Sequence, residues 1–579
     1  MKFFQFKYLK IILYLLVISF ILLSFLKCSS SSKFVAPNPL PDDNRSIPQP
    51  KYKKINYLKD FFNKQITIQI IQSLDFSRQL RHLFGKPKQA FNTDAFDEVP
   101  NSSWFTNRNA YRQMSLKEIA KGPDTGQGPD TTNFWTIKSA KSEGVTPGFQ
   151  IKDSRGDNYM IKFDPKGYSE LATGAEAIAT KLFYAMGYNV PENYITYFHP
   201  KILKLGDDVE FTDEKGNKRL MTNADIGEIF KKVERLPDGR IRALASKFVE
   251  SDAIIGGFKY NSTRKDDPND FVPHQHRREL RALYVPCSWL KHFDTKAGNN
   301  LDVYVTENGR SFVKHYLIDF GSTLGSAAHS PQPDYKGHEN DFDPHVMFQN
   351  IITAGLYVRS WEKLEPFKYS SVGRFDSHDF NPGKTKPNHP NPAFENCTNR
   401  DGYWGAKIVM SFTDKQLQTA VAQGQYSDPN AASYLLQILK ERRDIIGRYW
   451  FNKINPLDRF QISENSPGQQ ILSFIDLAVE SQLESKESTQ YCFDLRIGGV
   501  LVVDFQDIGN NTRIPIPNTQ EQQNFLRKIT LNNSNDLQCE IRIKTKRNSN
   551  KKWSKWVKVY LHLDKSSGKY SLLGILRQE

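Results

Sequence analysis

Residues 301–321, LDVYVTENGRSFVKHYLIDFG, hold the feature that most constrains the fold. Two runs rich in β-branched and aromatic residues are separated by Asn308-Gly309. Such a pair between two strand-like runs favours a tight two-residue turn, so the sequence predicts a β-hairpin. A polar run with H-x-D-x-K-x-x-N spacing, residues 292–299, precedes the hairpin, and Asp-Phe-Gly ends it. Two polar runs therefore flank one hairpin.

An earlier stretch, residues 134–165, is expected to form three strands. Turn-rich residues divide it into FWTIKSAK, FQIKD and YMIKFDP, and each run alternates apolar with polar residues. Successive strand residues face opposite sides, so Lys162, which has apolar neighbours on both sides, points away from the apolar face. The sequence thus predicts an antiparallel sheet that carries an outward-facing lysine.

A helix is expected over residues 169–188, where apolar residues recur at helical spacing. Ser169 is the expected N-cap, and Gly187 suits the helix end. The helix carries Glu176, and Glu170 is a second candidate for the same role. Taken alone, either glutamate is typical of a solvated helix surface.

This order of features resembles the protein-kinase-like superfamily, which has a strand lysine, a helix glutamate, an H-x-D-x-x-x-x-N loop, a hairpin and D-F-G. The resemblance covers about residues 134–455. It implies an α+β fold with a two-lobed core, in which the N-lobe is an antiparallel sheet plus a helix and the C-lobe is mainly helical. The runs DEVPNSSWFTNR (97–108) and HYLIDFGSTLGS (315–326) also resemble an uncharacterised group of bacterial secreted kinase-like proteins.

The resemblance implies that ATP is bound and that a phosphoryl group is transferred. Lys162 would contact the nucleotide phosphates, with Glu176 as its ion-pair partner. Asp294 would be the catalytic base that takes the proton of the acceptor hydroxyl, and Lys296 would steady the transferred phosphate. His292 is expected to support this loop structurally.

The same resemblance implies Mg²⁺, held by Asn299 and Asp319, because hard oxygen ligands suit this cation. The chain also departs from the common kinase pattern. The turn SEGVTPG (142–148) lacks G-x-G-x-x-G, residues 200–275 must hold an insertion, and no A-P-E signature follows D-F-G. These departures favour atypical kinases, such as lipid kinases and bacterial toxin kinases.

The N-terminus has the layout of an export signal. Three lysines precede an apolar run over residues 11–26, and Cys28 with a serine tract follows. This resembles the lipid-attachment site of bacterial lipoproteins, although Lys27 departs from the small residue that the family favours there. An uncleaved membrane anchor is the runner-up. Both interpretations place the chain in the cell envelope, exported and attached to a membrane.

The domain organisation follows from these patterns and from the composition of the connecting segments. We expect a signal and lipid-attachment segment (1–28), a flexible tether (29–56), an N-terminal extension (57–133), a kinase-like N-lobe with an insertion (134–275), a kinase-like C-lobe (276–455) and a β-rich accessory module (456–579).

Two smaller groups leave alternatives open. Cys492 and Cys539 lie in strand-like segments, and they either pair as a disulfide or remain buried thiols. The run GHENDFDPH (337–345) is either a metal site or, as we favour, a turn-rich polar loop.

The predicted function is a membrane-anchored, exported atypical kinase that uses ATP and Mg²⁺ to phosphorylate, or alternatively to nucleotidylate, an unknown acceptor. The alternative is a catalytically inactive kinase-fold lipoprotein that serves as a binding or scaffold module. A third interpretation, a β-rich structural lipoprotein, requires the kinase-like order to be coincidental. The net charge of +15 favours anionic partners, but no basic run interleaved with aromatic residues indicates nucleic-acid binding.

Overall fold

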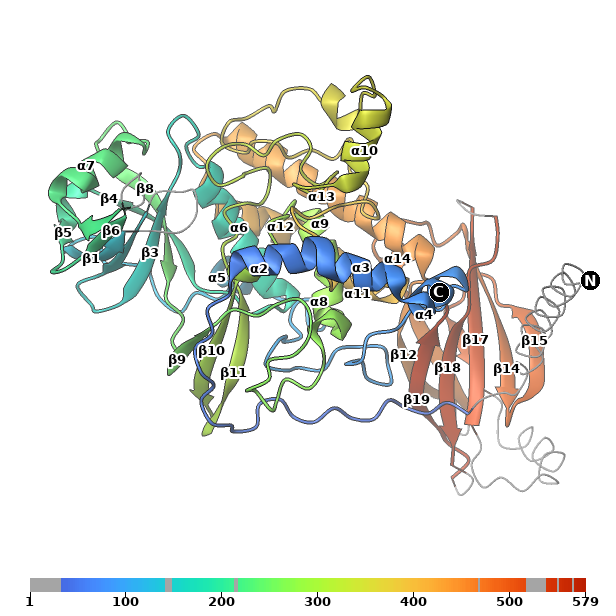
Figure 1. The fold of residues 1–579 in the computed structure, drawn as a ribbon. Helices are drawn as coiled ribbons and strands as arrows, with labels where there is room; N and C mark the ends of the chain where they lie inside the picture. Colours follow the sequence, from blue (N-terminus) through green and yellow to red (C-terminus); the bar gives the residue numbers. More distant parts are fainter. Residues whose placement is uncertain are drawn as a thin grey trace, which may run out of the picture.

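A computed structural model describes residues 33–140, 148–212, 217–466, 469–516, 538–548, 551–564 and 567–579 (Figure 1). The expected signal segment with Cys28 lies outside the described residues, and so does the turn between the first two predicted strands. Among the described residues, no helix combines the length and apolar character that crossing a membrane requires. The fold is α+β, with the predicted two-lobed core of a sheet-based N-lobe and a mainly helical C-lobe, followed by a β-rich module.

The N-lobe is built on a six-stranded sheet with the order β4-β8-β3-β2-β1-β5. Only the β1–β5 pair is parallel. The three strands expected within 134–165 are confirmed. The strands are β1 (Trp135–Ala140), β2 (Gly148–Lys152), β3 (Asn158–Phe163), β4 (Asn193–Phe198), β5 (Leu203–Leu205) and β8 (Ile241–Lys247).

The expected insertion separates two strands that are neighbours in this sheet. Between β4 and β8 the chain forms β5, a small hairpin and a helix. These added elements are β6 (Glu210–Thr212), β7 (Lys218–Leu220) and α7 (Asn223–Lys231). The insertion therefore lengthens the chain between Lys162 and Asp294 while β8 still pairs directly with β3.

Helix α6 (Leu171–Met186) packs on this sheet and ends at Gly187, as predicted. The predicted N-cap is wrong, because Glu170 occupies that position with a left-handed backbone. Asp164, at the end of β3, supplies the cap instead, and its carboxylate accepts hydrogen bonds from the backbone N–H groups of Ala172 (2.8 Å) and Thr173 (2.9 Å). The cap thus joins the sheet to the helix.

The predicted hairpin is confirmed as β10 (Asn300–Glu307) and β11 (Arg310–Leu317), which pair in one continuous antiparallel register. Asn308 and Gly309 have positive φ values of 51° and 73°, as a tight hairpin turn requires. A third strand, β9 (Ala253–Gly256), pairs with β10.

The C-lobe is mainly helical. Its helices are α8 (Arg278–Ala282), α9 (Tyr284–Trp289), α10 (Pro344–Ile352), α11 (Asn399–Met410), α12 (Asp414–Ala422) and α13 (Pro429–Lys453). The run HRRELRALYVPCSWLKH (276–292), whose sequence favours one helix, instead contains the two short helices α8 and α9. Pro286 has no N–H to donate to the carbonyl of Ala282, so it suits the first turn of a new helix rather than the interior of a continuous one.

The C-terminal module is a β-sandwich with its own core, in which side chains from two sheets form one hydrophobic cluster. The smaller sheet contains β12 (Leu457–Ser466), β13 (Gln469–Asp476) and β16 (Arg513–Pro515), and the larger contains β14 (Thr489–Ile497), β15 (Val500–Asp507), β17 (Gln538–Arg547), β18 (Val557–Leu563) and β19 (Tyr570–Arg577). A four-residue helix, α14 (Leu477–Glu480), follows β13. Cys492 and Cys539 are buried free thiols rather than a disulfide.

Residues 33–56, for which the sequence predicts a flexible tether, run extended along two parts of the molecule. Phe34 stacks on Tyr560 in the sandwich, with ring centroids 4.5 Å apart. Ile47 N–H donates to the Ser311 carbonyl at 2.9 Å in the hairpin. A segment of polar composition can therefore lie against the folded domains, because a backbone group and one aromatic ring make these two contacts. The six-segment division itself remains a prediction.

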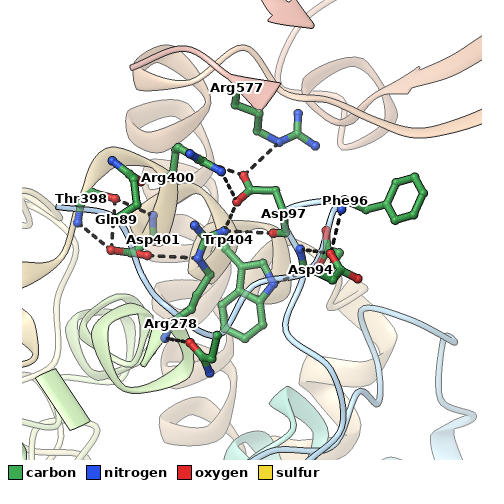
Figure 2. A network of polar contacts seen from close by, with 12 residues as sticks. Gln89, Asp94, Phe96, Asp97, Arg278, Thr398, Arg400, Asp401, Trp404 and Arg577 are labelled. Atoms are coloured by element: carbon green, nitrogen blue, oxygen red, sulfur yellow. Dashed lines mark hydrogen bonds and ion pairs between the residues drawn. The ribbon is translucent and has the colours of Figure 1, made fainter. Parts of the chain in front are cut away.

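The N-terminal extension fills the junction between the C-lobe and the sandwich (Figure 2). Asp97 lies at its centre and contacts Arg278 (2.6 Å), Arg400 (2.6 Å) and Arg577 (3.8 Å). Burial alone would raise the pKa of Asp97, but the three guanidinium groups outweigh it and lower that pKa to about 2. One carboxylate thus connects α8, α11 and β19.

Candidate active site

The strand lysine and the helix glutamate meet between the lobes. The Lys162 Nζ atom lies 2.7 Å from Glu176 Oε1 and 2.8 Å from Asp319 Oδ1. Glu176 is buried on α6, whereas the Asp319 side chain is 44% exposed. Burial disfavours the ammonium form, but the Asp319 and Glu176 carboxylates outweigh it and raise the pKa of Lys162. The lysine is therefore a fixed positive charge.

The residue after Asp319 attaches this segment to helix α6. Phe320 is fully buried and stacks on Phe183 of α6, with ring centroids 4.7 Å apart. His292 packs against the same two rings, and burial lowers its pKa. His292 is thus a packing residue, in keeping with the structural role expected from the sequence.

The loop before the hairpin holds the remaining predicted site residues. Lys296 Nζ lies 2.9 Å from Asp294 Oδ2, and Asn299 Nδ2 donates to the Asp294 carbonyl at 2.7 Å. The Asn299 Oδ1 atom takes no part in that hydrogen bond. The Tyr57 ring, from the N-terminal extension, lies over Gly298, where an added Cβ would come within 2.7 Å of the ring.

A cleft of about 510 Å³ opens beside Lys162 and Asp319. It lies between the N-lobe sheet and the hairpin, and its walls combine apolar side chains with the charged pair. The lining includes Ala140, Met160, Lys162, Phe248, Val249, Ile254, Gly298, Leu301, Ile318 and Asp319. A ligand with a flat apolar ring and an anionic tail would place its ring against the apolar side chains and its tail beside Lys162.

The side chains fit a nucleotide with a hard divalent cation. The Asp319 carboxylate and the Asn299 amide oxygen are ligand types that Mg²⁺ accepts, and Lys162 supplies a charge for phosphate. Within the described ranges, no three His, Cys, Asp or Glu side chains gather as a metal site. A cation here would thus complete its coordination with water and substrate oxygens, which is common for Mg²⁺.

The structure shows which of the two candidate glutamates pairs with Lys162, and what the acidic residues of the 337–345 run contact. Glu170 accepts the backbone N–H of Ser427 at 3.0 Å, so it connects the lobes and does not pair with Lys162. In the 337–345 run, Asp341 contacts Lys336, and Asp343 contacts Lys386 at 2.6 Å. These carboxylates are engaged by lysines, as in a polar loop.

Sequence reasoning missed two residues that position the site. Asp164 caps α6, and Arg242 on β8 donates to Thr173 and to the carbonyl groups of Gly424 (2.6 Å) and Gln425 (2.7 Å). Asp164 lies inside the predicted strand run YMIKFDP and seven residues before α6, so the sequence did not mark it as a helix cap. Arg242 has no local signal, because its acceptors lie 69, 182 and 183 residues away.

No family model and no curated protein matches the sequence. Among solved structures, the proinflammatory kinase CtkA of Helicobacter pylori is similar, with a TM-score of 0.30 and 13% identity over 55% of this chain and 96% of that chain. The Golgi casein kinase has a TM-score of 0.27 and 11% identity over 72% and 93%. Its structure with Mn/ADP bound gives 0.27 and 9% over 71% and 94%.

Proposed function

We propose that this chain is a kinase that transfers a phosphoryl group from ATP-Mg²⁺ to an unknown acceptor. The observation that carries the proposal is Lys162, which bridges Glu176 and Asp319 beside the cleft between the lobes. A structural ion pair would need only one carboxylate. The second, half-exposed carboxylate faces a cleft large enough for a nucleotide.

The chemistry requires positioning and counter-charge. Lys162 would bind the phosphates, and Lys296 would hold the transferred group. The acceptor oxygen attacks the γ-phosphorus, the bond to the β–γ bridging oxygen breaks, and Asp294 takes the acceptor proton. Mg²⁺ held by Asp319 and Asn299 would neutralise charge on the phosphates.

Nucleotide binding is tested by thermal unfolding of the full chain with ATP and Mg²⁺. We expect the wild type to be stabilised, by about 3 kcal/mol at a hundredfold excess over Kd. Asp319→Ala should lose this effect, whereas Asp238→Ala, an exposed aspartate in the insertion, should keep it. Absence of stabilisation in the wild type would favour the inactive binding module.

Transfer is tested separately from binding. Asp294→Asn should retain the nucleotide-dependent stabilisation and lose transfer of labelled γ-phosphate by about 10²-fold or more. If Asp294→Asn transfers phosphate as fast as the wild type, the assigned base is wrong.

We further propose that the chain is exported and attached to a membrane through Cys28, as its N-terminal sequence favours. Replacement of Cys28 with serine should release the protein from membranes if the cysteine carries lipid. An uncleaved anchor would leave the variant membrane-bound.

A further inference from the structure

A helical run at the start of the N-terminal extension has an inverted polarity. It comprises α2 (Tyr57–Phe62), a π-helical segment (Asn63–Thr67), α3 (Ile68–Leu74) and, after a bend at Asp75, α4 (Phe76–Leu83). Figure 1 shows this run in blue along the C-lobe. An ordinary surface helix buries its apolar face and exposes its polar face.

The side of the run that faces the C-lobe is largely polar. Its buried side chains are Asp60, Lys64 and Gln65, and Asp60 and Lys64 form an ion pair at 2.8 Å. Gln69 and Gln72 both donate to the Glu395 carboxylate, at 2.6 Å and 3.1 Å. Hydrogen bonds and an ion pair therefore hold much of the run in place.

The opposite side is apolar and faces outward. Ten large apolar side chains there are between 47% and 77% exposed, and they are Leu58, Phe62, Ile66, Ile70, Ile71, Leu74, Phe76, Leu80, Leu83 and Phe84. Single exposed apolar residues are ordinary, but a continuous series marks a binding surface. We call these ten residues the apolar face.

Positive charge accompanies the apolar face. Residues 57–88 contain six Lys or Arg and two Asp, a net charge of +4. A cavity of about 500 Å³ lies between α3, α4 and the C-lobe, and its charged lining side chains are the cations Arg78, Arg81 and Lys88 and the carboxylate of Asp75. Burial lowers the pKa of His82 and His276 in the same lining, so these imidazoles are neutral at pH 7. Apolar side chains beside cationic side chains suit a binding partner that has an apolar interior and an anionic surface.

We propose that the apolar face lies in the interface of a bilayer that contains anionic phospholipids, with the basic cavity beside the headgroups. A helix that lies flat in such an interface buries apolar side chains and places Lys and Arg at headgroup level. The uninterrupted helical part, residues 57–74, is about 27 Å long at 1.5 Å per residue, enough for several turns to lie along the surface. The proposal is independent of phosphoryl transfer.

The experiment uses the full chain and a local probe, so that the N-terminal segment does not dominate the readout. An environment-sensitive fluorophore is attached to Leu74→Cys on the apolar face, and to Lys231→Cys on α7 as the control. The parent chain, carried through the same labelling, provides the background from native cysteines. Phosphatidylglycerol-containing vesicles and pure phosphatidylcholine vesicles are the two lipid probes.

We expect a blue shift and at least a twofold intensity rise for the label at position 74 on anionic vesicles, and little change at position 231. Arg81→Glu with Lys88→Glu should raise the lipid concentration for half-maximal response about fivefold per reversed charge. If the chain co-floats with the vesicles in a density gradient but the fluorescence of the label at position 74 does not change, the proposal is overturned. If the fluorescence intensity at position 74 rises without lipid and grows with protein concentration, a second copy of the chain covers the apolar face and the proposal is overturned. An equal response on both vesicle types would overturn the assignment to anionic lipid.

Discussion

At the scale of single residues, the decisive arrangement is one lysine between two carboxylates of unequal burial. Glu176 is 2% exposed and depends on Lys162, whereas Asp319 reaches the cleft. A buried carboxylate is costly unless it is paired and hydrogen-bonded. The lysine therefore supports the structure of the N-lobe as well as any ligand.

This double role gives a stability prediction. Lys162→Ala leaves the Glu176 carboxylate buried beside Asp319 without the lysine, and we expect a loss of about 3 kcal/mol in the free energy of unfolding. Adding Glu176→Gln should recover part of this loss, because the neutral amide needs no counter-charge. Denaturant unfolding of both variants measures the difference. If the double variant is less stable than Lys162→Ala alone, the charge of Glu176 is not what makes the loss of Lys162 costly.

At the scale of elements, α6 is held at both ends by residues outside it. Asp164 caps its first turn, and Gly187 ends it with φ = 117°. A Cβ at Gly187 would lie 2.4 Å from the Phe105 ring and 2.7 Å from the Thr106 carbonyl oxygen. The end of the Glu176 helix is thus packed directly on the N-terminal extension.

Substitution of Gly187 tests this packing against backbone strain. Gly309→Ala is the matched control, since Gly309 also has positive φ but no atom within 4 Å of an added Cβ. We expect Gly309→Ala to cost about 1 kcal/mol through strain, and Gly187→Ala to cost at least about 2 kcal/mol more through the clash. Equal losses in chemical unfolding would show that Phe105 moves aside freely.

The sequence predicted the elements whose signals are local. The strands around Lys162, the Asn308-Gly309 hairpin and the helix end at Gly187 each follow from neighbouring residues. What it missed depends on distant partners, such as Arg242, which bonds carbonyl groups beyond α12. The outward apolar face was also missed, because periodicity identifies an amphipathic helix but does not say which side faces the protein.

At the scale of the whole molecule, a buried charge network connects the extension, the C-lobe and the sandwich. Arg577 of β19 lies 2.8 Å from Asp458 and stacks over the Tyr403 ring at 4.6 Å. Arg577 also donates to the Leu457 carbonyl and lies 3.8 Å from Asp97, which binds Arg278 and Arg400. Loss of Asp97 would leave three guanidinium groups close together, and the stability of the junction should depend on its ionisation.

The pKa of Asp97 sets the pH range of this effect. Because the folded-state pKa is lowered from 3.8 to about 2, the ionised carboxylate stabilises the protein above about pH 4, and this contribution is lost as pH falls toward 2. The shift corresponds to about 2 kcal/mol. Asp97→Asn should lose about 3 kcal/mol at pH 7, because Arg400 loses its carboxylate partner while Arg278 and Arg577 keep only Asp401 and Asp458. The variant should show a shallower further loss between pH 4 and pH 2 than the wild type. Denaturant unfolding at pH 7, 4 and 2.5 measures both. Parallel pH profiles for the two proteins would mean that another carboxylate controls the acid sensitivity of the junction.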